Sequence, residues 1–162
     1  MDLDALDRNI ITLLQQDGRM SNAELAERVN LSQSACLRRV RRLEEEGVVQ
    51  GYVMLVNQAA IGLPLNVFVE ISLKALTEEA LDAFEAAVRD CPAVMASYLM
   101  SGDADYLLHM AVADAEDYER LHRNYLSRFP YVSRIRSSFA LRTVSKKTAF
   151  DLGGAAQEAS ST

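Results

Sequence analysis

The sequence lacks several features that would assign it to a broad class of protein. It has no run of about 18 apolar residues, which a membrane-spanning helix requires. Its acidic start, MDLDALDRN, is typical of neither a secretory signal nor a transit peptide. The two cysteines, Cys36 and Cys91, and the two histidines, His109 and His122, are too scattered for a disulfide framework or a zinc site. We therefore expect a cytoplasmic protein with no membrane partner, metal or cofactor.

Common catalytic and nucleotide-binding motifs are missing too, since there is no P-loop, no dinucleotide-binding glycine pattern and no Ser-His-Asp order. The 162 residues are 49% hydrophobic and 25% charged, which is ordinary for a globular chain with one large or two small domains. The net charge of −6 counts weakly against nucleic acid. However, four arginines lie within residues 38–42, and DNA binding needs positive charge only where the phosphates lie.

Residues 1–50 have apolar side chains at helical spacing and predict three helices, over about 5–16, 22–29 and 33–46. Asp4 can cap the first helix, and Ser21-Asn22-Ala23-Glu24 has the pattern of a capping box at the start of the second. Ser32 can cap the third helix. The short turn between the second and third helices is typical of a helix-turn-helix.

From residue 48 the pattern becomes that of strands. Residues 48–56, VVQGYVMLV, predict a strand that leaves the helical domain. The order strand, helix, strand, strand, helix, strand then follows, with strands expected at about 65–74, 94–101, 106–113 and 132–144, which is the ferredoxin-like order. Two helices cover one face of such a sheet, and a second subunit is the simplest cover for the other. We expect domains at 1–50 and 65–150, a linker at 51–64 and a disordered tail at 151–162.

The outward face of the third helix is the predicted DNA-binding surface. Cys36, Val40 and Leu43 form the inward stripe, and small polar residues at the helix start can enter the major groove. The predicted DNA contacts are Ser21, Asn22, Ser32, Gln33, Ser34, Leu37, Arg38, Arg41 and Arg42. Of these, Gln33, Ser34 and Arg38 are assigned to bases, and Arg41 or Arg42 to phosphate.

The arginine cluster also has a purely structural interpretation. A solvated helix could pair its arginines with the acidic run at residues 44–46, three or four positions away. Arg39 lies beside Val40 on the inward stripe, so it could instead form an ion pair with a nearby Asp or Glu. Cys36 is expected to be a buried apolar residue and not a redox switch.

Four stretches of the chain carry a family resemblance: LDALDRNIITLLQQDGRMSNAELAERVNLSQSACLRRVRRLEEEGVVQGY, FVEISL, SGDADYLL and VSKKT. Together they span about residues 1–150, and they resemble the leucine-responsive regulatory protein/AsnC family of transcription regulators. The resemblance implies an α+β protein in which a winged helix-turn-helix is followed by a ferredoxin-like βαββαβ domain for ligand sensing and oligomerisation. It implies homodimers that often close into octamers. It also implies amino acids that bind between dimers and change DNA binding or assembly.

Residues 101–106, Ser-Gly-Asp-Ala-Asp-Tyr, are the candidate effector loop. Gly102 can expose backbone N–H groups to a carboxylate, and Asp103 and Asp105 can face an ammonium. Any hairpin turn prefers the same residue types, but the loop falls where the family binds its effector. The predicted set is Tyr98, Met100, Ser101, Gly102, Asp103, Asp105 and Tyr106, with Ser138 and Ala140 added from the resemblance. Asp105 is the first choice, and Met100 favours leucine or methionine as the ligand.

Two other functions share this layout. Some haem-biosynthesis decarboxylases resemble the family, but His109 and His122 are the only histidines here that could serve a tetrapyrrole. A nucleoid-organising protein that ignores small molecules would share every feature except a working effector loop. We expect a sequence-specific transcription regulator with no enzymatic activity, because the arginine-bearing helix favours DNA.

Overall fold

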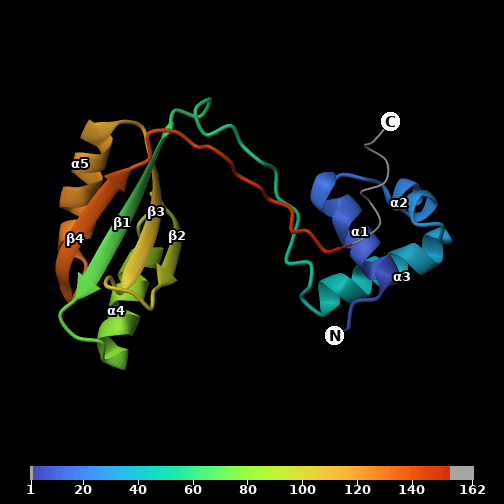
Figure 1. Ribbon diagram of the computed structural model, residues 1–162, viewed down its shortest axis with the longest axis horizontal. Helices are drawn as coiled ribbons and strands as arrows, with labels where there is room; N and C mark the ends of the chain where they lie inside the picture. The colour runs from blue at the N-terminus through green and yellow to red at the C-terminus, as the bar shows by residue number, and fades with distance from the viewer. Residues whose placement is uncertain (1, 154–162) are drawn as a thin grey trace. The chain divides into compact units, whose positions relative to one another are not determined.

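The computed structural model describes residues 2–153 of the chain, which form two units (Figure 1). One unit comprises residues up to Leu55 together with the segment from Ser145 onward, and the other comprises Val56–Val144. Residues 145–153 therefore belong with the N-terminal helices and not with the sheet. The prediction of a disordered tail falls mostly on residues 154–162, which lie outside the described residues. No helix in the described part of the chain has the length and apolar character to span a bilayer.

The first unit contains the three predicted helices: α1 (Ala5–Gln16), α2 (Asn22–Arg28) and α3 (Gln33–Glu45). Each begins after the predicted cap, because Asp4, Ser21 and Ser32 each accept a hydrogen bond from the backbone N–H three residues later. The capping box expected at Ser21 is only half formed. The Glu24 carboxylate does not reach back to Ser21 and instead pairs with Arg28 at 2.8 Å, one turn further along α2.

A complete capping box is found at the start of α1, where it was not predicted. The Asp4 carboxylate accepts from the Asp7 N–H at 2.8 Å, and the Asp7 carboxylate accepts from the Asp4 N–H at 3.3 Å. The usual pattern has Glu or Gln at the second position, so the Asp-Asp version gives a weaker signal in the sequence.

The core of the first unit joins all three helices through the buried residues Ile10, Leu25, Ala26, Val29, Cys36 and Leu43. Cys36 is fully buried, and burial raises the pKa of its thiol, as expected for a structural cysteine. The turn from α2 to α3 passes through Asn30, whose φ of 54° is tolerated by asparagine better than by most residues. Its tightness places the start of α3 beside α2, in helix-turn-helix form.

The strand predicted at residues 48–56 is wrong for this chain, because residues 48–64 form no strand in the structure. A strand needs a hydrogen-bonded neighbour, and this segment has none within the described chain. Its apolar side chains are left in solvent, with Val53 and Met54 each 86% exposed and Leu55 74% exposed. The last predicted strand also ends early, at Phe139 and not at residue 144.

The second unit has the predicted βαββαβ order. Its elements are β1 (Leu65–Leu73), α4 (Glu78–Arg89), β2 (Val94–Leu99), β3 (Tyr106–Val112), α5 (Ala115–Asn124), a 3-10 turn (Leu126–Arg128) and β4 (Val132–Phe139). The four strands form one antiparallel sheet in the order β2-β3-β1-β4 (Figure 1). This arrangement confirms the ferredoxin-like prediction.

The two faces of the sheet differ in character. Val67, Val69 and Ile71 of β1 are fully buried in a core with Phe84 of α4 and Tyr118 of α5. Side chains alternate along a strand, so the other face of β1 carries the intervening residues, among them Phe68 and Glu70. We call this second face, with the cross-strand partners His109, Leu107 and Arg136, the open face.

Candidate DNA-binding surface and effector pocket

The outward face of α3 carries exposed polar side chains and two arginines without partners. Gln33, Ser34, Leu37, Arg38 and Arg41 are all exposed. Neither Arg38 nor Arg41 forms an ion pair or a side-chain hydrogen bond with any residue in the range 2–153. The pairing of these arginines with the acidic run at 44–46 is therefore not seen.

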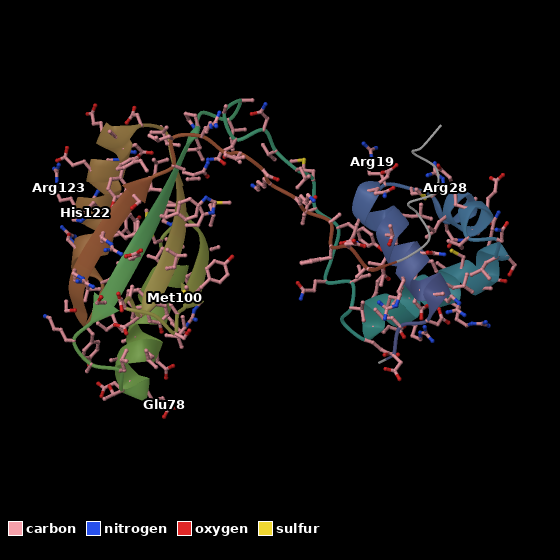
Figure 2. All side chains as sticks on the ribbon, in the orientation of Figure 1. Arg19, Arg28, Glu78, Met100, His122 and Arg123 are labelled. Atoms are coloured by element: carbon pink, nitrogen blue, oxygen red, sulfur yellow. The ribbon has the colours of Figure 1, made fainter. Side chains whose placement is uncertain are left out.

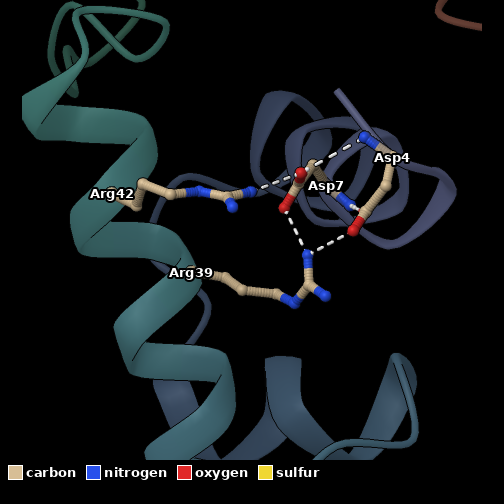
Figure 3. A network of polar contacts seen from close by, with 4 residues as sticks. All are labelled: Asp4, Asp7, Arg39 and Arg42. Carbon is tan, nitrogen blue, oxygen red and sulfur yellow. Dashed lines mark hydrogen bonds and ion pairs between the residues drawn. The ribbon is translucent and has the colours of Figure 1, made fainter. Parts of the chain in front are cut away.

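The other two arginines of α3 are bound to the carboxylates of Asp4, the N-cap of α1, and Asp7, in its first turn (Figure 3). Arg39 Nη1 lies 2.7 Å from Asp4 Oδ2 and 2.8 Å from Asp7 Oδ1, and Arg42 Nη2 lies 2.5 Å from Asp7 Oδ2. Asp7 is completely buried, so its charge is compensated by these two guanidinium groups and the Asp4 N–H. These ion pairs hold the start of α1 against α3.

The pKa directions agree with this geometry. Hydrogen bonds to the Asp4 and Asp7 carboxylates raise the pKa of Arg39. The pKa of Asp4 is lowered, first by the hydrogen bond from the Asp7 N–H and then by the one from Arg39. Both groups are thus held in their charged forms.

These contacts show which acids Arg39 and Arg42 bind within the first unit. Arg39 is a structural arginine, as one of its two interpretations held. Arg42 pairs with the buried Asp7, whereas Arg41 has no partner in the described chain, so of the two arginines predicted to bind phosphate we favour Arg41.

Polar groups at the start of α2 and α3 position the two helices against each other. The Asn22 side-chain amide donates to the Gln33 carbonyl at 2.9 Å, and this contact joins the first turns of both helices. Ser32 Oγ accepts from the Ala35 N–H and lies 3.2 Å from Ser34 Oγ. Ser21 Oγ accepts from Glu24, which leaves its own O–H proton for an outside acceptor.

The loop between β2 and β3 is held to β1 by Asp105. The Asp105 carboxylate accepts from the Leu73 N–H at 2.7 Å, its N–H donates to the Ile71 carbonyl, and its carbonyl accepts from the Met100 N–H. The side chain chosen first for the ligand ammonium is therefore already bound to the end of β1. This favours a loop-positioning role for Asp105.

A pocket of about 290 Å³ lies between this loop and the sheet, and Met100, labelled in Figure 2, is one of the residues that line it. Its lining residues are Glu70, Met100, Gly102, Asp103, Ala104, Tyr106, Leu107 and Arg136. Four of the predicted effector residues are among them: Met100, Gly102, Asp103 and Tyr106. The others, Tyr98, Ser101, Asp105, Ser138 and Ala140, do not line it.

Tyr106 contributes little to this pocket with its ring. The ring packs against Phe84 at a centroid distance of 4.5 Å, and its hydroxyl donates to Glu85 at 2.8 Å, so the side chain belongs to the helix-covered core. Burial, with the Glu85 carboxylate as a second cause, raises the pKa of Tyr106 to about 12. Ser138 lies opposite Phe68, and the Ala140 N–H donates to the Asn66 carbonyl, further along the sheet.

Sequence reasoning missed two charged residues in the pocket, Glu70 and Arg136. They face each other across β1 and β4, with Arg136 Nε 2.6 Å from Glu70 Oε2. The sequence alone could have placed Glu70 away from the core, because side chains alternate along β1. It could not have paired Glu70 with Arg136, because that pairing depends on the register of two strands whose residues lie 66 positions apart.

Both histidines have structural surroundings. His109 Nε2 lies 2.7 Å from Asn66 Oδ1, and its ring stacks on Phe68 at a centroid distance of 5.1 Å. His122 on α5 meets the ring of Tyr118 edge-on. Within residues 2–153, no group of three or more His, Cys, Asp or Glu side chains is placed to hold a metal ion.

The fold and the α3 surface define the class of this protein, a helix-turn-helix transcription regulator with an attached ligand-binding domain. Two family models match the chain. Residues 3–50 match a winged helix-turn-helix DNA-binding domain, and residues 66–150 match the Lrp/AsnC ligand-binding domain. The chain therefore belongs to the Lrp/AsnC family of transcription regulators, as the resemblance predicted.

Individual relatives agree with this membership. The leucine-responsive regulatory protein of Salmonella typhimurium is 44% identical over 143 residues, which is 88% of this chain and 87% of that protein. Among solved structures, a transcriptional regulator from Neisseria meningitidis in complex with L-Met gives a TM-score of 0.89 at 34% identity, covering 94% of this chain and 98% of that one. An AsnC family transcriptional regulator from Agrobacterium tumefaciens gives a TM-score of 0.88 at 33% identity, and the match covers 93% of this chain and 98% of that one.

Proposed function

We propose that this regulator recognises specific DNA sequences through α3 and that a free amino acid, with leucine or methionine favoured, controls its DNA binding or its assembly. The DNA-binding part of this proposal is supported by a difference among the four arginines of α3. Arg39 and Arg42 bind the acids of α1, whereas Arg38 and Arg41 point to solvent with no partner in the described chain. Arg38 is then available to a guanine edge and Arg41 to a phosphate.

The effector part of the proposal is supported by the pocket beside the loop. At about 290 Å³ it lies at the small end of ligand pockets, which suits a single amino acid. Met100 and Leu107 supply apolar lining, while Glu70, Asp103 and Arg136 supply charges of both signs. The L-Met complex of the Neisseria regulator and the leucine-responsive relative of Salmonella support a neutral apolar amino acid.

We further propose that the working form is a homodimer that assembles into an octamer. The support is exposed apolar surface, because Val53, Met54 and Leu55 of the linker are 74–86% exposed and Phe68 on the open face is 40% exposed. Light scattering on the full chain tests this, and a monomer at micromolar concentration would refute it. We assign no enzymatic activity, because the matched relatives are regulators and both histidines have structural contacts.

A DNA-binding titration with the full chain tests the main proposal. A fragment from the gene's own upstream region and an unrelated fragment are compared at two salt concentrations, with and without pooled amino acids. We expect specific, salt-sensitive binding that the pool shifts. Binding without a shift would refute the effector part, and no preference between the fragments at either salt would refute the DNA part.

The Arg38→Ala variant tests the assignment of that arginine to a base. Loss of a bidentate contact costs about 1–3 kcal/mol, so affinity for the specific fragment should fall roughly fivefold to 100-fold or more while non-specific binding changes little. Arg123→Ala is the matched control, because it removes the same charge from α5 in the other unit. Equal losses on both fragments would show that Arg38 contacts only the backbone.

A further inference from the structure

We propose that Glu70 and Arg136 together recognise the two charges of the amino-acid effector, with Arg136 binding its carboxylate and Glu70 its ammonium group. The inference rests on the proposed function, since it names residues that would select the ligand of the same pocket. Neither residue belongs to the loop that the sequence indicated.

The sheet register brings the two charges to the pocket. Glu70 of β1 lies directly opposite Arg136 of β4 on one side and opposite Leu107 of β3 on the other. The three side chains therefore form a row across the open face, and all three line the pocket with residues 100–104 of the loop. From β4 to β3, the row presents the cation of Arg136, the anion of Glu70 and the apolar side chain of Leu107.

The contact between the two charges leaves room for a ligand. Arg136 Nε lies 2.6 Å from Glu70 Oε2, and Arg136 Nη2 pairs with the same oxygen. A guanidinium has five N–H donors and a carboxylate has two acceptor oxygens, so both groups keep hydrogen-bonding capacity. The side chains are 66% and 37% exposed, and an ion pair this open stabilises a fold by only about 0–1 kcal/mol. A zwitterion can therefore rearrange the pair at little cost and replace one ionic contact with two.

The other charged groups at the loop are less suited to these roles. Among the residues that line the pocket, Arg136 is the single cation, so a ligand carboxylate has no second basic side chain to bind. Asp105 is held by the Leu73 N–H, which leaves Glu70 and Asp103 as the acids near the pocket. Because Arg136 is the only basic side chain among the residues that line the pocket, the pocket should also reject acidic amino acids, whose second carboxylate would lack a partner.

Ligand analogues and charge-neutral variants test the assignment in the full chain by calorimetry. L-methionine is compared with N-acetyl-L-methionine, which has lost the ammonium charge, and with L-methioninamide, which has lost the carboxylate. We expect wild type to bind both analogues at least tenfold more weakly than L-methionine. Arg136→Gln should weaken L-methionine about tenfold or more and should no longer discriminate against the amide. Glu70→Gln should do the same for the N-acetyl analogue.

Arg134→Gln is the matched control, because Arg134 lies two residues earlier on β4, opposite Ser72, and does not line the pocket. It should leave all three affinities unchanged. If Arg136→Gln and Glu70→Gln weaken every ligand by the same factor, the pair is merely structural and the proposal is overturned. Wild-type affinities in both variants would overturn it as well. If wild type binds DNA but no amino acid, the proposed effector function fails and this inference fails with it.

Discussion

Replacing Asp7 with alanine is expected to destabilise the DNA-binding unit more than any other single change at a charged residue. The Asp7 carboxylate is fully buried and contacts Arg39 at 2.8 Å and Arg42 at 2.5 Å. Alanine leaves Arg42 without its partner and leaves Arg39 with Asp4 alone (Figure 3). The α1 and α3 helices would then be joined by their apolar core and by the Arg39–Asp4 ion pair alone.

The magnitude follows from the exposure of the partners. Removing one member of a buried ion pair commonly costs about 3–5 kcal/mol, because the other charge stays buried and unpaired. Here the side chains of Arg39 and Arg42 are 25% and 43% exposed, so water partly solvates the charges that remain. Alanine also removes the Asp7 half of the capping box, which is a long hydrogen bond of 3.3 Å and adds little to the loss. We therefore expect a loss of about 2–3 kcal/mol, below the usual range for buried pairs.

Hydrogen exchange on the full chain measures this loss element by element. Each 1.4 kcal/mol is a factor of ten, so protected amides in α1 and α3 should exchange roughly 30 to 140 times faster, while those in β1 and β3 should not change. Asp2→Ala removes the same charge at an exposed position and serves as the control. Adding Arg42→Met to Asp7→Ala should recover part of the loss, since it removes the stranded charge.

Two results would refute this reasoning. A change of less than about threefold in α1 and α3 would mean that the ion pair contributes little beyond its desolvation cost. An equal acceleration in the sheet would mean that Asp7→Ala acts on the whole chain and not on the α1–α3 contact.

Three further predictions concern the arginines, the loop and alkaline pH. Arg41→Ala should reduce the slope of log K against log salt concentration by about one phosphate contact per subunit. Arg42→Ala should leave that slope unchanged and lower the stability of the first unit. The reverse pattern in salt titrations would contradict our assignment. Asp105→Ala should free the Leu73 N–H, speed its exchange and weaken amino-acid binding without changing DNA affinity; unchanged exchange at Leu73 would argue against a positioning role. The raised pKa of Tyr106, about 12, favours its protonated form in the folded state, so this stability is complete below pH about 10 and is lost as pH rises through about 12. Tyr106→Phe should therefore show a smaller loss of stability than wild type between pH about 8 and about 11 in urea titrations, and an equal loss would refute the assignment.

Secondary structure was predictable because its signals act over short distances. The helix caps at Asp4, Ser21 and Ser32 involve a backbone N–H only three residues away, so the residue types alone located all three helix starts. Alternation along residues 65–73 likewise showed which face of β1 is buried. The segment 48–56 has the same β-branched character but no neighbour to pair with, so residue pattern alone did not make it a strand.

The sequence by itself determined the order of elements, the helix-turn-helix and the outward position of Arg38 and Arg41, because each depends on periodicity within one helix or strand. Only the tertiary structure decided which charges meet. Asp7 binds Arg39 and Arg42 from more than 30 positions away, and Glu70 meets Arg136 across 66. Such pairs depend on how helices pack and how strands register, and no local pattern encodes either. The same packing paired Arg42, one of the two arginines predicted to bind phosphate, with Asp7 of α1, and it joined Asp105 to the end of β1 and placed Glu70 in the pocket.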